Sequence, residues 1–140
     1  MRDIRQFIYH QTGTATGTLE SIDRYHRLLG WKSCGYHFLI TPDAVIHKGR
    51  PQSVVGAHCK GDNAHSLGIC CVGAGDAFPL DVGYMSTPMF EALIQLTQQL
   101  RGAYPTVGSA LWGHRERASG KIQGKTCPGF DVDILRKLLC

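Results

Sequence analysis

Apolar and polar side chains alternate in the first run of the chain, which spans residues 4–12. Two faces follow from this two-residue period, with Phe7 and Tyr9 on one and Ile8 and His10 on the other. The pattern predicts a β-strand. The polar turn Gln-Thr-Gly follows His10 directly, so we expect this histidine to face a cleft at the strand end.

Further β-strands are predicted by short runs of β-branched and aromatic residues. Residues 35–50, GYHFLITPDAVIHKGR, predict a hairpin that turns around Pro42. Three more strands are expected at SVVGAH (53–58), SLGICCVG (66–73) and ALWGHRE (110–116). The run at 66–73 is apolar on both faces, which indicates a central strand.

Helical periodicity and capping residues mark two helices in the first two thirds of the chain. Thr18 is a suitable N-cap for a helix that continues to Leu29 and stops at Gly30. The sequence Ser-Thr-Pro at 86–88 predicts a second helix start, because proline fits the first helical turn. Its apolar stripe recurs every three or four residues and ends before Tyr104: Met89, Leu93, Leu96 and Leu100.

A third helix is expected at the end of the chain. Asp131 is the predicted cap, and the apolar face comprises Ile134, Leu135, Leu138 and Leu139. Strands and helices therefore interleave, and all are short. The fold class that follows is a mixed α/β (α+β) arrangement with a central mixed sheet flanked by helices, in one domain over residues 1–140.

Composition and charge narrow the function classes. The net charge is +4, and the basic residues are scattered without interleaved aromatic side chains, so no nucleic-acid partner is expected. No apolar run approaches the roughly 20 residues of a membrane span. The start, MRDIRQFIYH, lacks the apolar centre of a signal peptide. We therefore expect synthesis in the cytoplasm. The protein is also expected to be a monomer.

Cysteine usage directs attention to one position. In a reducing compartment the six cysteines are expected to be free, and the adjacent Cys70 and Cys71 to be buried apolar residues. Cys127 is different, because it precedes a proline in a loop and follows Lys125 by two residues. Thiolate and imidazole are ligands that zinc prefers, and a catalytic zinc keeps three protein ligands and one open position.

The candidate partners of Cys127 are the seven histidines, and spacing alone does not choose among them. Local context favours His10 and His114, which both end predicted strands. On spacing alone, a buried thiol with two hydrogen-bonded histidines is the simpler interpretation, because such scattered ligands form no motif.

Four blocks in one order carry a family resemblance. FIYHQTGT, HRLLGWKSCGYHFLI, GRPQSVVGAHCKGDNAHSLGICCVG and the closing GHRE with CPGFD cover nearly the whole chain. Together they resemble the type 2 N-acetylmuramoyl-L-alanine amidases, which include small phage lysozymes of the amidase type and the peptidoglycan recognition proteins. The resemblance to the small phage enzymes is the stronger.

The resemblance implies a zinc site and a reaction. By position, His10, His114 and Cys127 correspond to the zinc ligands, and one Zn²⁺ per chain is expected. Tyr36 and Lys125 correspond to catalytic residues. The implied reaction is hydrolysis of the amide bond between N-acetylmuramic acid and L-alanine in peptidoglycan or a muropeptide.

Two further residues, His58 and Asn63, are implied substrate contacts, although a structural role for each remains open. The loop before Cys127 is longer than in the compact phage enzymes, so Lys121 competes with Lys125 for the role of oxyanion cation.

Several functions fit these expectations. A phage or prophage endolysin, acting on the wall after release, is the first, and a cytoplasmic wall-recycling amidase is its variant. A peptidoglycan-binding module without catalysis and a metal-free hydrolase with Cys127 as nucleophile are the alternatives from other classes.

Overall fold

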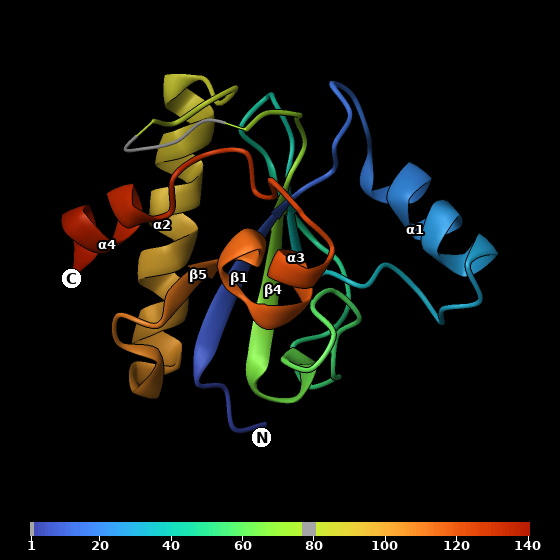
Figure 1. Ribbon diagram of the computed structural model, residues 1–140, viewed down its shortest axis with the longest axis horizontal. Helices are drawn as coiled ribbons and strands as arrows, with labels where there is room; N and C mark the ends of the chain where they lie inside the picture. The colour runs from blue at the N-terminus through green and yellow to red at the C-terminus, as the bar shows by residue number, and fades with distance from the viewer. Residues whose placement is uncertain (1, 77–80) are drawn as a thin grey trace.

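A five-stranded mixed sheet forms the centre of the computed structural model, which describes residues 2–76 and 81–140 (Figure 1). The strand order is β3-β2-β4-β1-β5, and only β3 runs antiparallel to its neighbour. The strands are β1 (Gln6–Gln11), β2 (Phe38–Ile40), β3 (Ile46–Lys48), β4 (Ser66–Cys71) and β5 (Leu111–Gly113). The predicted fold class is therefore confirmed, and β4 is central as expected.

The helices lie around this sheet. They are α1 (Leu19–Leu28), α2 (Thr87–Ala103), α3 (Ala118–Ile122) and α4 (Asp133–Leu139), with short 3-10 turns η1 (Asn63–His65), η2 (Pro105–Val107) and η3 (His114–Glu116). None of the described helices is both long and apolar enough to cross a membrane.

The main core lies between the sheet and α2. Phe7 and Tyr9 of β1 are fully buried on this face, and the predicted α2 stripe from Met89 to Leu100 is buried against it. The buried Tyr9 hydroxyl is satisfied by Thr97 Oγ1 of α2 at 2.8 Å. Burying this hydroxyl without a partner would cost about 1–3 kcal/mol. Because side chains alternate along a strand and Phe7 and Tyr9 face α2, Ile8 and His10 point to the opposite face of the sheet.

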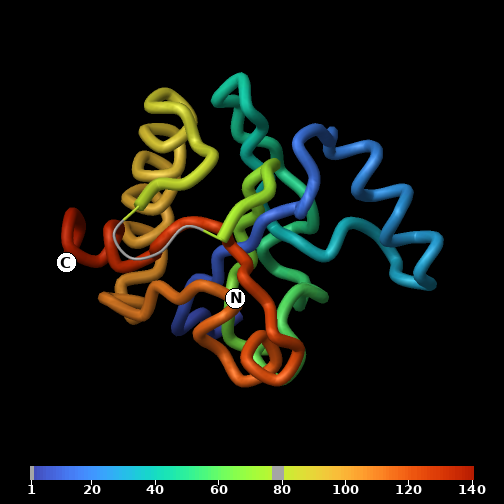
Figure 2. The backbone as a smooth tube through the Cα atoms, turned by 45° about the horizontal axis from the view of Figure 1, so that its top comes forward, coloured from blue at the N-terminus to red at the C-terminus, as the bar shows by residue number. Residues whose placement is uncertain are grey.

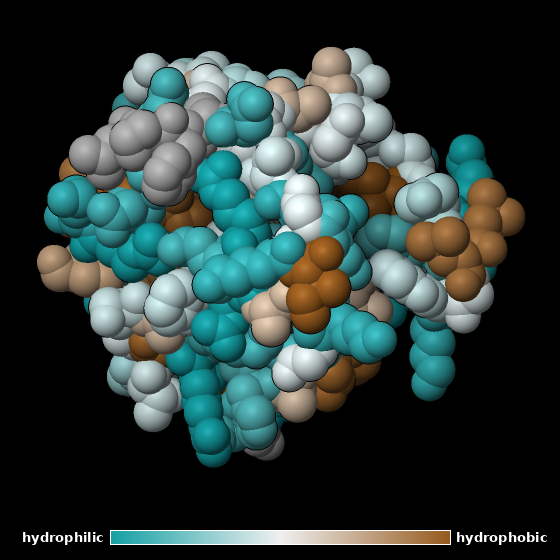
Figure 3. Space-filling view, viewed as in Figure 1, coloured by the Kyte–Doolittle hydropathy of each residue, from teal (hydrophilic) through white to brown (hydrophobic). Residues whose placement is uncertain are grey.

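The opposite face of the sheet is covered only in part. Leu39, Cys70 and Val72 form a small cluster with Leu19 and Ile22 of α1. Helix α1 stands away from the body of the molecule, and the tube view shows it as an arm joined by two loops (Figure 2). Apolar side chains remain exposed along it, as the space-filling view shows at the right (Figure 3).

The helix ends match the predicted capping residues in two cases of three. Thr18 caps α1 with a capping box, and Ser86 accepts a hydrogen bond from the Met89 N–H at the start of α2. The prediction for α4 is wrong by one residue, because Val132 occupies the N-cap position. The Asp131 carboxylate still accepts from the Asp133 N–H at 3.1 Å.

The expected apolar face of α4 is only partly correct. Leu135 is fully buried, whereas Leu138 is 59% exposed.

The strand predicted at residues 53–58 is wrong. Val54 and Val55 are both exposed and do not alternate, and the carbonyl oxygen of Val54 accepts hydrogen bonds from the Arg2 guanidinium and from the His37 ring. These side-chain bonds replace a sheet ladder, so the segment forms a loop. The segment before Cys127 was expected to be a loop, but it contains helix α3, which was not predicted.

The hairpin turn between β2 and β3 places Ala44 at φ +65°. A left-handed conformation costs an L-residue about 1–2 kcal/mol, and glycine avoids this cost. We expect Ala44→Gly to raise the free energy of unfolding by about 1 kcal/mol, measured by urea denaturation. The matched control is the exposed helical alanine Ala103, where glycine should lower stability by up to about 1 kcal/mol. Equal effects at the two positions would contradict the strain at Ala44.

Candidate metal centre and active-site cleft

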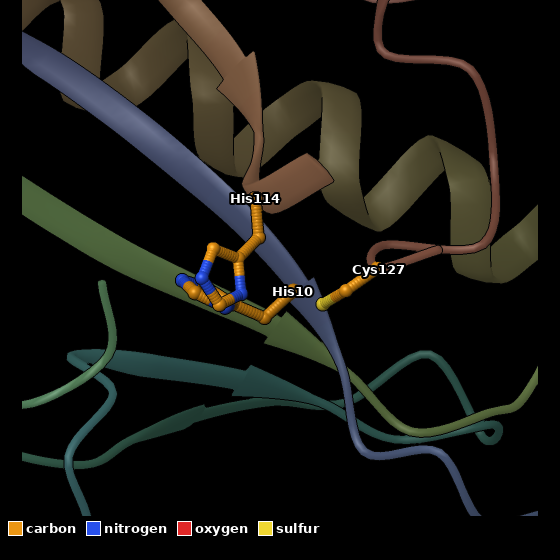
Figure 4. A group of neighbouring side chains, drawn as sticks. All are labelled: His10, His114 and Cys127. Carbon is orange, nitrogen blue, oxygen red and sulfur yellow. The ribbon is translucent and has the colours of Figure 1, made fainter. Parts of the chain in front are cut away.

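Three side chains from distant parts of the sequence meet at the carboxyl ends of β1 and β5. One ligand atom from each of His10, His114 and Cys127 lies within 4.8 Å of the others, and all three residues are buried. His10 is near the end of β1, and His114 follows the last residue of β5. Because these strands are parallel neighbours, their ends share one edge of the sheet. In Figure 4 the three side chains lie in front of the strands, on the side opposite α2.

The thiol of Cys127 is held by the backbone of β1. The Gln11 N–H donates to Cys127 Sγ at 3.0 Å, and the Arg115 N–H donates to the carbonyl oxygen of Cys127 at 2.9 Å. The peptide bond between Cys127 and Pro128 is cis. Burial raises the pKa of the Cys127 thiol to about 11. The thiol is therefore protonated near neutral pH when no metal ion is bound to it.

The two imidazoles use the same nitrogen for contacts with the protein. His10 Nε2 lies 2.9 Å from His58 Nδ1, and His114 Nε2 lies 3.1 Å from Ser119 Oγ. Among the described residues, the Nδ1 atom of neither ring has a hydrogen-bond partner, so this atom is left for another ligand. Burial lowers the pKa of His10 well below its ordinary value, and burial together with the charge of Lys125 lowers the pKa of His114. Both rings are therefore neutral at pH 7, as metal ligands must be.

The donor set fits zinc. Two neutral imidazoles and one thiolate are among the ligand sets of catalytic zinc, which keeps a fourth position open. Tetrahedral zinc with bonds of about 2.0–2.3 Å separates its ligand atoms by about 3.3–3.8 Å. The observed 4.8 Å limit is therefore within side-chain movements of about 1 Å.

A cleft of about 560 Å³ opens beside this group. Its lining contains the predicted metal ligands His10, His114 and Cys127, the predicted catalytic residues Tyr36 and Lys125, and the predicted substrate contacts His58 and Asn63. The polar groups thus converge on one concave surface, which is typical of an active site.

Lys125 and Lys121 lie in different places. Lys125 lines the cleft, and its charge acts on both His114 and Cys127. Lys121 lines a separate hollow with Trp112, Arg115 and Glu116. The geometry therefore favours Lys125 as the cation that faces a substrate in the cleft.

Tyr36 lies in the cleft next to His10, with ring centroids 5.1 Å apart. Burial, with the Cys70 thiol nearby, raises the pKa of Tyr36 well above its ordinary value. The phenol is therefore neutral in the protein without a cation and suited to donate a hydrogen bond rather than to act as a base.

Asn63 and His58 have internal partners. Asn63 Oδ1 accepts from the backbone N–H groups of His58 and Cys59, both at 3.0 Å, so this side chain closes its own turn. Both ring nitrogens of His58 are in hydrogen-bonding contacts, with His10 and with Ser66 Oγ. Burial lowers the pKa of His58 to about 3. These contacts favour a structural role for both His58 and Asn63, which the sequence had left open beside substrate contact.

No pattern in the sequence indicated Ser119, which contacts His114. It lies five residues after His114, in the longer loop, and neither periodicity nor a motif distinguishes it there.

Known proteins resemble this chain in sequence and in fold. The family model described as N-acetylmuramoyl-L-alanine amidase matches residues 1–130. The endolysin of Enterobacteria phage K11 is 33% identical over 134 residues, which are 94% of this chain and 84% of the relative. Peptidoglycan-recognition protein SC2 of Drosophila melanogaster is 31% identical over 133 residues, covering 89% of this chain and 67% of the relative.

A solved structure agrees with this relationship. The N-acetylmuramoyl-L-alanine amidase LysC from Clostridium intestinale URNW superposes with a TM-score of 0.82 at 29% identity, covering 99% of this chain and 86% of that one. The family model, the relatives and the shared fold extend over most of the chain, and the residues matched by the family model include His10, His114 and Cys127. The chain belongs to the N-acetylmuramoyl-L-alanine amidase family.

Proposed function

We propose that this protein is a zinc-dependent amidase that hydrolyses the bond between N-acetylmuramic acid and L-alanine in peptidoglycan, in the manner of a phage endolysin. Family membership and the endolysin relatives support the amidase activity. The observation that carries the zinc dependence is the convergence of His10, His114 and Cys127 in one cleft.

The proposed ligands would hold the ion through Nδ1 of His10, Nδ1 of His114 and Sγ of Cys127. When bound, Zn²⁺ supplies a Lewis acid that polarises the scissile carbonyl and makes water nucleophilic near neutral pH. The Lys125 ammonium stabilises negative charge that develops on the carbonyl oxygen, in the manner of an oxyanion hole. The neutral Tyr36 phenol donates a hydrogen bond that orients the reacting groups.

The metal-free cysteine hydrolase is disfavoured by the environment of Cys127. A nucleophilic cysteine requires a lowered pKa, and burial raises the pKa of this thiol to about 11. The contacts of its Sγ are with the backbone of Gln11, and the Nε2 atom of His114 is directed to Ser119. Among the described residues, this Sγ therefore makes no hydrogen bond with an imidazole nitrogen that could take its proton.

The binding module without catalysis is disfavoured by the complete set of groups in the cleft. Two imidazoles, a thiol, a phenol and an ammonium line the cleft, and binding alone requires none of the metal-ligand geometry. The relatives named endolysins support action on the cell wall after release, and a wall-recycling amidase remains the variant of this proposal.

Digestion of purified cell wall tests the function. Mass spectrometry should detect released intact stem peptides and free lactyl groups on muramic acid, with no new reducing sugar ends. A chelator should abolish the release and added Zn²⁺ should restore it. Cys127→Ser should lose both zinc and activity, because the soft thiolate ligand is gone. Wall binding without release would favour the binding module, and inactivation by thiol alkylation with indifference to chelator would favour the cysteine hydrolase.

Zinc affinity should depend on pH with a defined slope. The imidazoles are neutral at pH 7, so binding releases one proton, from the Cys127 thiol. Raising the pH removes this competing proton, and the apparent association constant should rise about tenfold per pH unit between about pH 7 and 9. Competition with a chromogenic chelator measures it. A slope near zero would mean that the thiolate exists before the metal arrives, and a slope near two or three that the histidines are protonated.

Replacing Lys125 separates the two lysines. Lys125→Gln should lower kcat by about 100- to 1000-fold, the loss typical of one oxyanion donor, and should leave the zinc content unchanged. Lys121→Gln is the matched control and should remain within about twofold of the wild type, because Lys121 faces another hollow. The reverse ranking of the two variants would transfer the role to Lys121.

A further inference from the structure

Both candidate ligand histidines are hydrogen-bonded, through their Nε2 atoms, to side chains that lead toward one residue, Asp62. We propose that His58 and Ser119 are positioning residues, which fix His10 and His114 as Nε2–H tautomers and so direct both Nδ1 lone pairs at the metal. The inference rests on the metal site of the proposed function.

In the first chain of hydrogen bonds, the carbonyl group at the far end determines which atom of each pair is the donor. Ser66 donates its hydroxyl proton to the carbonyl oxygen of Asp62 at 2.7 Å. Ser66 Oγ can therefore only accept in its contact with His58 Nε2 at 3.2 Å, so His58 carries its proton on Nε2. His58 Nδ1 is then an acceptor, and the proton in its 2.9 Å contact with His10 belongs to His10 Nε2. The lone pair of His10 remains on Nδ1.

The second chain reaches the same result independently. The Cys59 thiol donates to the Asp62 carboxylate, with Sγ 3.6 Å from Oδ2. Because a carboxylate only accepts, Cys59 Sγ is the acceptor in its 3.4 Å contact with Ser119 Oγ. Ser119 has then used its only proton and accepts from His114 Nε2 at 3.1 Å. His114 therefore also keeps its lone pair on Nδ1.

Asp62 is held in the form that both chains require. Arg117 Nη2 and Nε lie 3.0 and 3.3 Å from its two carboxylate oxygens, and Gln6 Nε2 lies 3.4 Å from Oδ1. The hydrogen bond from Arg117 is the main cause that lowers the pKa of Asp62, so the carboxylate stays ionised. Its side chain is only 16% exposed. Asp62 thus accepts the last hydrogen bond of the first chain on its carbonyl oxygen and that of the second chain on its carboxylate.

The ring of His58 is fixed by packing as well as by hydrogen bonds. A Cβ atom at Gly68 of β4 would lie 2.6 Å from His58 Cγ, so the ring rests directly on the strand backbone. Asn63 holds the backbone of the same loop through the His58 N–H. The ring therefore presents Nδ1 to His10 at a set position, as groups that orient metal ligands do.

Paired variants test the positioning role. His58→Phe keeps a ring and removes the acceptor, whereas His58→Asn returns an acceptor near the place of Nδ1. Ser119→Ala removes the other acceptor, and Ser119→Thr retains it. The dissociation constant for Zn²⁺, measured by chelator competition, should rise about 10- to 100-fold for His58→Phe and Ser119→Ala and recover substantially in the Asn and Thr variants. The exposed His65→Gln is the control and should be unchanged.

Nitrogen-15 NMR of the metal-free wild type provides the readout that a general structural role would not move. Both His10 and His114 should show the Nε2–H tautomer, and each should shift toward a mixture in its own acceptor-free variant. An Nδ1–H tautomer in the wild type overturns the inference even if every variant fails to fold. So does a folded His58→Phe with wild-type zinc affinity. If the wild type itself neither binds zinc nor cleaves the wall, the proposed function fails, and the tautomers still decide the hydrogen-bond chains.

Discussion

Parallel pairing of β1 with β4 and β5 is the constraint on which the rest of the molecule depends. It pairs both edges of β1, and the two-residue period of the strand sends Phe7 and Tyr9 into the α2 core while His10 points to the other side. Because β5 runs in the same direction, His114 arrives at the same edge of the sheet. The core and the candidate metal centre are therefore opposite faces of one strand.

The parts of this arrangement that depend on local sequence could be predicted. Periodicity and capping residues located β1, β4, α1 and α2, since each has enough residues for its pattern to be distinct from chance. The loop at residues 53–58 could not be distinguished from a strand, because its β-prone valines are exposed and the Val54 carbonyl is bound by Arg2, a contact between residues far apart in the sequence. The apolar face of α4 was predicted only in part, since Leu135 is buried and Leu138 is exposed to solvent.

The candidate site required both kinds of information. Spacing alone did not choose among the histidines, whereas the family resemblance indicated the same three residues that the fold brings within 4.8 Å. What no pattern revealed is how the ligands are held. Ser119 and Asp62 act through tertiary hydrogen bonds, which leave no periodic trace in the sequence. The segment between His114 and Cys127 that carries both candidate lysines also carries Ser119, which contacts His114.

The arm-like placement of α1 has a consequence for how the cleft moves. Among its residues only His26 is buried. The helix joins the body through Leu19 and Ile22, which pack on the small cluster of the sheet, and through hydrogen bonds from the Cys34 N–H to the Asp23 carboxylate and from the Gly35 N–H to His26 Nδ1. Trp31, which follows this helix, lines the cleft. Segments with few apolar contacts open at a free energy well below that of global unfolding. The side of the cleft at Trp31 therefore adjoins a helix with one buried side chain, whereas the His10 side belongs to a strand paired on both edges.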